Sequence, residues 1–267
     1  MSTTTLERPA TTTTPVVRAA IPNSRLVGVE LQKMFDTRSG FWLVTGVAVL
    51  SLIATAATML FGDRSTLEYG DFAQAVGIPT TVILPVLGAL AVSSEWGQRT
   101  SLTTFTLVPS RARVVAAKFV SVLAVGIGSL AFVFVAAALG NLLNGAIAGV
   151  TPVWDLDLTT ILQIALADQI GMLMAFMLGA LLRNSPGAIV GYFVYALVLP
   201  GISGALADAQ QWWADHAAWF DLRTATIPLY DDHMSSHDWA QLGVTTVIWL
   251  VIPLAIGLRL LMRSEVK

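Results

Sequence analysis

The chain has 267 residues, of which 55% are apolar and 12% are charged, and its mean hydropathy is +0.72. Soluble domains have about 25% charged residues, so this composition argues against a soluble globular protein and indicates an integral membrane protein. The chain has no cysteine, which excludes disulfides and thiolate metal sites. Its high Ala, Gly and Val content is typical of GC-rich bacterial genomes, such as those of actinobacteria.

The first 22 residues are Thr-rich and of low complexity, and we expect them to form a disordered tail. Asn23 or Ser24 is then placed to cap a short helix with Val27, Leu31, Met34 and Phe35 on one face. Two interpretations remain open: an amphipathic helix at the cytoplasmic membrane surface that also touches a soluble partner, or an anchor for the next segment. The residues assigned to this surface helix and its end are Arg25, Lys33, Phe35 and Arg38.

Six apolar segments follow, each long enough to cross a hydrocarbon core as a helix. They lack the alternating pattern of barrel strands and are too long for them, so we predict an all-α membrane protein. Residues 23–267 would form a single transmembrane domain. The predicted spans are 41–61, 72–94, 119–140, 158–182, 186–207 and 240–261.

The basic residues predict the orientation of these spans, because Lys and Arg in short flanking loops stay on the cytoplasmic side. With the N-terminus inside, thirteen of the fifteen basic residues are cytoplasmic, and only Arg64 and Arg223 lie outside. The seventeen acidic residues divide the other way, with five inside, eleven outside and Asp168 within a span. We therefore predict six spans with both termini in the cytoplasm.

The polar segment between the second and third spans, residues 95–118, reads EWGQRTSLTTFTLVPSRARVVAAK. Leu102 and Phe105 would share one face of a short helix that ends at Pro109. Ser110 would cap the next helix, whose first turns carry Arg111, Arg113 and Lys118 as interface anchors. A simple connection needs only a few residues, so this length predicts a separate helical element.

This segment resembles the coupling loop of the type 2 ABC exporter permeases. It has an acidic residue at the end of the second span, a glycine two residues later, a Thr/Leu-rich stretch, then Pro-Ser-Arg and a lysine. The six spans, the cytoplasmic termini and the helix before the first span are also similar. The coupling residues that the resemblance implies are Glu95, Gly97, Arg99, Thr100, Leu102, Phe105, Pro109, Arg111 and Lys118.

The resemblance implies a permease subunit of an ATP-driven exporter in the bacterial cytoplasmic (inner) membrane, with a hydrophobic drug, lipid or peptide as substrate. Its partners would be two copies of an ABC ATPase subunit, a second permease chain as homodimer or heterodimer, and membrane lipid, but not nucleic acid. ATP and Mg would bind the ATPase, because no stretch here resembles a Gly-rich phosphate loop. The chain would bind no cofactor and would not itself be an enzyme. Two alternatives remain open: an ion-coupled secondary transporter and a non-transporting membrane anchor or sensor.

Asp168 is the one acidic residue predicted within a span, where a charge costs at least about 2.5 kcal/mol unless it is paired, protonated or near water. It either contacts the substrate or a gate, or it is a hydrogen-bonded packing residue near the outer interface. Tyr192 and Tyr195 in the fifth span are further candidates for the substrate path, with packing as the alternative.

Three smaller features complete the prediction. Gly171, Ala175 and Gly179 form a small-residue face for close helix packing. Pro200-Gly201 should bend or break the fifth span, and the acidic, Trp-rich segment 208–239 should form re-entrant or surface helices. His233 and His237 are four residues apart, but a solvated loop explains them better than a metal site, so no metal site is predicted.

Overall fold

The structure is a computed structural model that describes residues 21–97, 110–231 and 234–263; within these ranges it is helical and contains no strand. Among these described residues, six helical segments are long and apolar enough to cross a membrane, which indicates an integral membrane protein. Each contains one of the predicted spans, so the prediction of six apolar helices is confirmed. Their bounds are Arg38–Phe61, Tyr69–Ser94, Arg111–Ala148, Leu158–Leu182, Ser185–Ala209 and Ser236–Met262.

Several of these segments are built from more than one helix. The elements before the fourth span are α1 (Asn23–Phe35), α2 (Arg38–Phe61), α3 (Tyr69–Ile83), α4 (Pro85–Gly97) and α6 (Arg111–Ala148). The elements from the fourth span onward are α7 (Leu158–Leu182), α8 (Ser185–Phe193), the π-turn η1 (Val194–Val198), α9 (Leu199–Ala209), α10 (Gln211–Phe220), α11 (Leu222–Thr226), the 3₁₀ turn η2 (Ile227–Tyr230), α12 (Ser236–Thr246), the π-turn η3 (Val247–Val251) and α13 (Ile252–Arg263).

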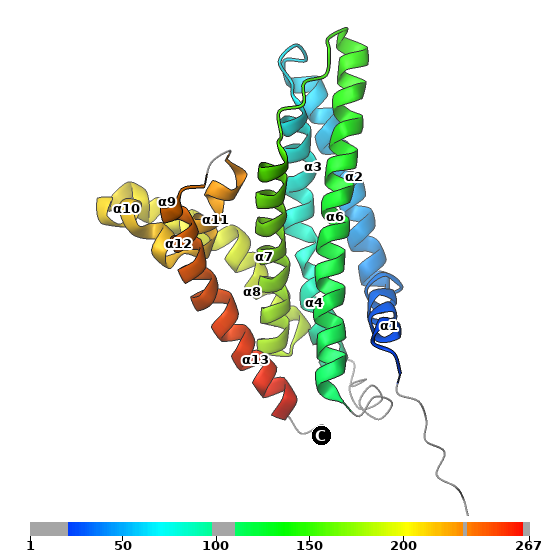
Figure 1. The fold of residues 1–267 in the computed structure, drawn as a ribbon, viewed down its shortest axis with the longest axis vertical. Coiled ribbons are helices and arrows are strands. Elements are labelled where there is room, and N and C mark those ends of the chain that lie inside the picture. Colours follow the sequence, from blue (N-terminus) through cyan, green and yellow to red (C-terminus); the bar gives the residue numbers. More distant parts are fainter. Residues whose placement is uncertain (1–20, 98–109, 232–233, 264–267) are drawn as a thin grey trace, which may run out of the picture.

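The spans form an elongated bundle (Figure 1). We call the end that holds α1, the end of α4, the start of α6 and the end of α13 the lower end, and the end where α2 meets α3 the upper end. Helices α3, α4, α6 and α7 run along the long axis, while α12–α13 crosses obliquely and α9–α11 project to one side. The most extensive packing is between α4 and α7, so this pair forms the centre of the bundle.

Helix α6, Arg111–Ala148, has 38 residues. It is therefore longer than the predicted third span, residues 119–140. At about 1.5 Å per residue it measures about 57 Å, well beyond a hydrocarbon core of about 30 Å. Its upper turns bind the α6–α7 and α2–α3 connections. Asn141 Nδ2 donates to the Val153 carbonyl oxygen at 2.8 Å, and Asn144 Nδ2 donates to the Arg64 carbonyl oxygen at 3.0 Å. These long-range bonds extend the helix past its apolar part.

Close packing of α4 on α7 depends on the predicted small-residue face. A Cβ atom at Gly179 would lie 2.5 Å from the Ala89 carbonyl oxygen, so only glycine allows this approach. Ala175 is fully buried on the same face. At Gly171, by contrast, a Cβ atom would meet nothing within 4 Å. The face therefore packs at its lower part and opens at Gly171.

Pro200 of the fifth span and Pro253 of the sixth span each follow a π-turn. Proline lacks an N–H, and its ring collides with the carbonyl group four residues earlier in an α-helix. In η1 the Leu199 N–H bonds to the Val194 carbonyl oxygen, and in η3 the Ile252 N–H bonds to the Val247 carbonyl oxygen. These wider turns make room for Pro200 and Pro253. The fifth span therefore continues through Pro200 as one segment instead of breaking there.

The segment between the fifth and sixth spans folds back onto the bundle. Leu222, Ala225 and Leu229 are at most 1% exposed and belong to the same apolar core as Ala167 of α7. Trp249 of η3 fixes the neighbouring helix, because its Nε1–H donates to the Phe220 carbonyl oxygen at 2.6 Å. This packing brings α11 and η2 against α7.

The two glycines of α7 supply a matched test of this packing. Gly179→Ala should lower the free energy of unfolding by about 1–3 kcal/mol, because the added methyl group forces α4 away from α7. Gly171→Ala makes the same change of helix propensity but meets open space, so its stability should be unchanged or higher. Unfolding of the detergent-solubilised protein measures both. Equal effects of the two substitutions would contradict the close approach.

Candidate functional site

A buried ion pair joins three helices at the lower end. The Lys118 ammonium of α6 donates to Glu30 Oε2 of α1 at 2.6 Å and to the Ala91 carbonyl oxygen of α4 at 2.9 Å. Lys33 donates to the other carboxylate oxygen of Glu30 at 2.7 Å. Glu30 is 7% exposed and Lys118 is 5% exposed, so the pair lies inside the protein. We call these residues the α1–α4–α6 junction.

A second set of contacts fixes the start of α1. The Arg113 guanidinium donates to Asn23 Oδ1 at 3.0 Å from Nε and at 2.8 Å from Nη2, and it also bonds to the Ile21 carbonyl oxygen. Asn23 or Ser24 was expected to cap this helix, and this expectation is wrong. The helix begins at Asn23 itself, with Pro22 in the cap position and no side-chain cap, and the Asn23 oxygen binds Arg113 instead.

Of the predicted coupling residues, Lys118 belongs to this junction. Glu95 and Gly97 belong to the last turn of α4, while Arg99, Thr100, Leu102, Phe105 and Pro109 lie outside the described residues. Arg111 is in the first turn of α6, where its Nη1 lies 3.5 Å from the Met262 carbonyl oxygen of α13. Ser110 takes the predicted cap position but forms no side-chain cap bond.

The predicted surface position of Lys118 is wrong. The sequence favoured an interface anchor because Lys118 follows a basic stretch, whereas α1 covers the side chain and neutralises it. The side chains assigned to the surface helix are exposed, and they are Arg25, Lys33, Phe35 and Arg38. On the predicted apolar face Phe35 is 41% exposed and Met34 is buried, and the charged Glu30 is the other buried side chain of α1.

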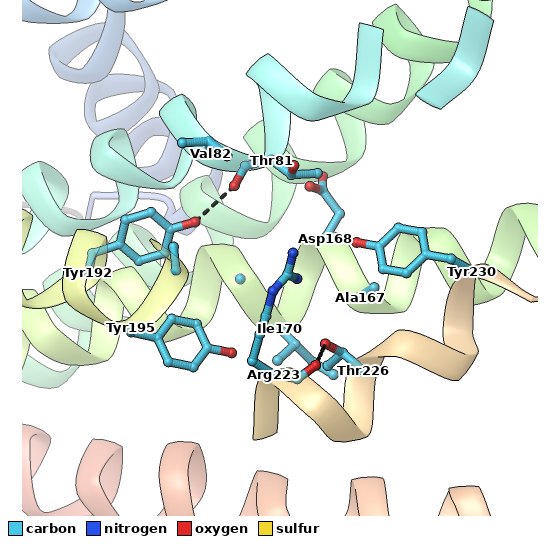
Figure 2. Close-up of a pocket in the computed structure, with 12 residues that line it drawn as sticks. Thr81, Val82, Ala167, Asp168, Ile170, Tyr192, Tyr195, Arg223, Thr226 and Tyr230 are labelled. Atoms are coloured by element: carbon cyan, nitrogen blue, oxygen red, sulfur yellow. Dashed lines mark hydrogen bonds between the residues drawn. The ribbon is translucent and has the colours of Figure 1, made fainter. Parts of the chain in front are cut away.

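A polar cavity lies higher in the bundle, between α3, α7, α8–η1 and α11–η2 (Figure 2). Its volume is about 450 Å³, including its opening. It brings together the three residues predicted for a substrate path or gate with residues from the segment after the fifth span. Its lining is Thr81, Val82, Ala167, Asp168, Ile170, Gly171, Tyr192, Tyr195, Ala196, Arg223, Thr226 and Tyr230.

Asp168 forms one wall of this cavity. It lies ten residues after the first residue of α7, Leu158, or about 15 Å along the helix, which is near the middle of the span. Its side chain is 6% exposed, and the Ser129 hydroxyl of α6 donates to its Oδ2 at 3.2 Å. The residue is thus hydrogen-bonded within the protein and in contact with the cavity, and it lies near the middle of α7 instead of near its outer end.

The two tyrosines use their hydroxyl groups differently. Tyr192 donates to the Thr81 carbonyl oxygen at 2.8 Å and so links α8 to α3. Tyr195 is 9% exposed, its hydroxyl points into the cavity, and among the described residues this hydroxyl has no hydrogen-bond partner (Figure 2). Buried hydroxyl groups are normally hydrogen-bonded. Tyr195 therefore offers the cavity a donor that the described protein does not use.

Arg223 is a charged cavity residue that the sequence did not reveal. It was counted among the outer basic residues, but its side chain points into the cavity and interacts with Tyr230 (Figure 2). Asp221 holds the local turn by accepting a bond from the Arg223 N–H at 2.9 Å. The available signal was the apolar spacing of Leu222, Ala225 and Leu229, which is that of a buried helix face.

The histidines form no cluster in the described part of the chain, where no group of three or more potential metal ligands occurs. His233 lies outside the described residues. His237 contacts Gln241 at 3.1 Å and packs edge-on against the Trp219 ring. His237 is thus an exposed residue at the start of α12 with two neighbouring side chains.

No protein-family model matches the sequence, and no curated protein is significantly similar to it. The resemblance to type 2 ABC exporter permeases therefore depends on residues 95–118 and on the pattern of spans alone.

The junction predicts a clear difference between its two lysines. Lys118→Met should cost about 3–5 kcal/mol of unfolding free energy, because Glu30 loses its buried partner. Lys33→Met should cost less than about 1 kcal/mol, since the Lys33 side chain is 42% exposed. The double variant Glu30→Leu/Lys118→Met should recover most of the loss, because it leaves no buried charge. Unfolding in detergent measures all three, and equal losses for the two lysine variants would contradict the burial of the pair.

Proposed function

We propose that the chain is the permease subunit of an ATP-driven exporter of the type 2 ABC kind, which couples at its lower end to a separate ATPase subunit. The α1–α4–α6 junction carries this proposal. The segment that resembles a coupling loop, residues 95–118, begins in α4 and ends in α6. Both helices contact the ion pair of Glu30 and Lys118. A partner that moves this segment would act on α1, α4 and α6 together.

The same helices lead from the junction to the cavity. Helix α6 carries Lys118 at the junction and Ser129 beside Asp168, and these two positions are about 16 Å apart along the helix. The second span carries Ala91 at the junction and Thr81 at the cavity. Rigid movement of these helices would change the shape of the cavity, which is how domain closure in an ATPase drives transport.

In this proposal the lower end faces the cytoplasm of a bacterium and both termini lie there. Two copies of the chain, or this chain and a related one, enclose the path, while ATP and Mg are bound by two ATPase subunits. The exported compound is hydrophobic, and membrane lipid surrounds the assembly. The division of basic residues between the two sides of the predicted spans supports the orientation.

A second candidate is an ion-coupled secondary transporter. Such proteins use more than one charged residue near the middle of the membrane. The sequence offered only Asp168, but the cavity also contains the Arg223 side chain. The presence of both charged residues in one cavity favours a secondary transporter more than the sequence alone does. An inverted repeat is not visible in the sequence.

Purification from the native membrane distinguishes the two candidates. We expect the detergent-solubilised chain to retain an ATPase subunit, detected by mass spectrometry and by ATP hydrolysis. Glu95→Ala should weaken this association about 10- to 100-fold, the effect of losing a hydrogen bond to a charged group. Asp208→Ala, which changes an exposed acidic residue at the end of α9, should retain the subunit in full.

Recovery of the chain alone, without ATPase activity, would refute the exporter. The secondary transporter would then be tested by uptake into vesicles with and without an ion gradient.

A further inference from the structure

We propose that the cavity beside Asp168 binds a small zwitterion, with its ammonium group at Asp168 and its anionic oxygens at Arg223. The anionic group is a carboxylate or a phosphodiester. This site is a property of the chain by itself and does not depend on coupling to an ATPase.

The two opposite charges of the cavity are the first argument. Asp168 and Arg223 line the same space, yet within residues 21–97, 110–231 and 234–263 neither forms an ion pair. A charge near the middle of a membrane is costly unless it is paired or near water. An anion alone would be repelled by Asp168, and a cation alone by Arg223. A zwitterion offers a partner to both.

The lining of the cavity offers a ligand both hydrogen-bond donors and a hydrogen-bond acceptor. The Arg223 guanidinium and the Tyr195 hydroxyl are hydrogen-bond donors that point toward the same space (Figure 2). Tyr195 is 91% buried and unpartnered among the described residues, as a donor that awaits a ligand oxygen would be. Asp168 supplies only acceptor oxygens when ionised, and Ser129 occupies one of them. The cavity thus presents both donor groups and an acceptor to the same ligand.

The size of the cavity limits the ligand. The volume of about 450 Å³ includes open solvent at its mouth, so the enclosed part is smaller and admits only a small molecule or a small group. Tyr192 closes one wall by its bond to Thr81. The proposed ligand is therefore of amino-acid size, either free or as the headgroup of a phosphatidylethanolamine lipid. These two sources share the chemistry of an ammonium joined to an anion by a short linker.

Direct binding to the purified full chain in a non-ionic detergent tests the proposal. The probes are β-alanine, for a free zwitterion, and glycerophosphoethanolamine, for a lipid headgroup; equilibrium dialysis measures their dissociation constants. Ethanolamine carries only the ammonium group, and inorganic phosphate carries only the anion. We expect at least one zwitterion to bind about tenfold or more tightly than both single-charge probes. Which zwitterion binds identifies the source.

Variants then locate the site. Arg223→Gln and Asp168→Asn should each weaken zwitterion binding about 10- to 100-fold, because each removes a charge-assisted contact. Tyr195→Phe, which removes only the hydroxyl, should weaken it about 2- to 10-fold and provides a test if a charge variant fails to fold. Asp215→Asn changes an exposed carboxylate on α10 and should bind as the parent does.

Two results would overturn the proposal. One is the absence of binding by both zwitterions to the folded parent chain. The other is binding of phosphate as tight as that of the zwitterions, lost in Arg223→Gln but kept in Asp168→Asn, which would identify a simple anion site. Neither result bears on the association with an ATPase, so the two proposals fail independently.

Discussion

The ion pair between Glu30 and Lys118 is the contact on which the arrangement of the lower end depends. Removing two charges from water is expensive, and a buried pair often contributes less to stability than apolar side chains of similar volume. Here the ion pair fixes the relative positions of α1, α4 and α6. The Lys118 ammonium reaches a carboxylate of α1 and a backbone carbonyl of α4 at the same time, so only one placement of these three helices satisfies it. Apolar packing alone would allow α1 to slide.

The charged residues of the cavity, unlike those of the junction, are not paired with each other. At the junction, opposite charges touch and their fields cancel locally. At the cavity, Asp168 and Arg223 belong to different elements and are separated by space, with Ser129 and Tyr230 as their neighbours within the protein. The protein thus has one charged site that is complete and one that an additional group would complete. The first suits a fixed structural contact, and the second suits a binding site.

Local sequence properties predicted the fold well, because the hydropathy and length of a span depend on consecutive residues. The six spans and the close packing at Gly179 could be predicted for this reason. The ends of α6 could not, since Asn141 and Asn144 are polar and stabilise the helix by binding distant carbonyl groups. The partners of Lys118 and the inward direction of Arg223 were also missed. Both depend on elements that are remote in sequence, Glu30 in one case and the buried face of α11 in the other.

The two π-turns have a mechanical consequence. They occur in the stretches VYALVLP and VIWLVIP, which have the same spacing of valine, leucine and proline in the last two spans. A π-turn contains one residue more than an α-helical turn, so moving it by one position along a helix rotates each side chain it passes by about 100° without unwinding the helix. Tyr195 lies within the first of these turns. Moving that turn along the helix would rotate the Tyr195 ring into or out of the cavity wall. The position of Pro200 would not change.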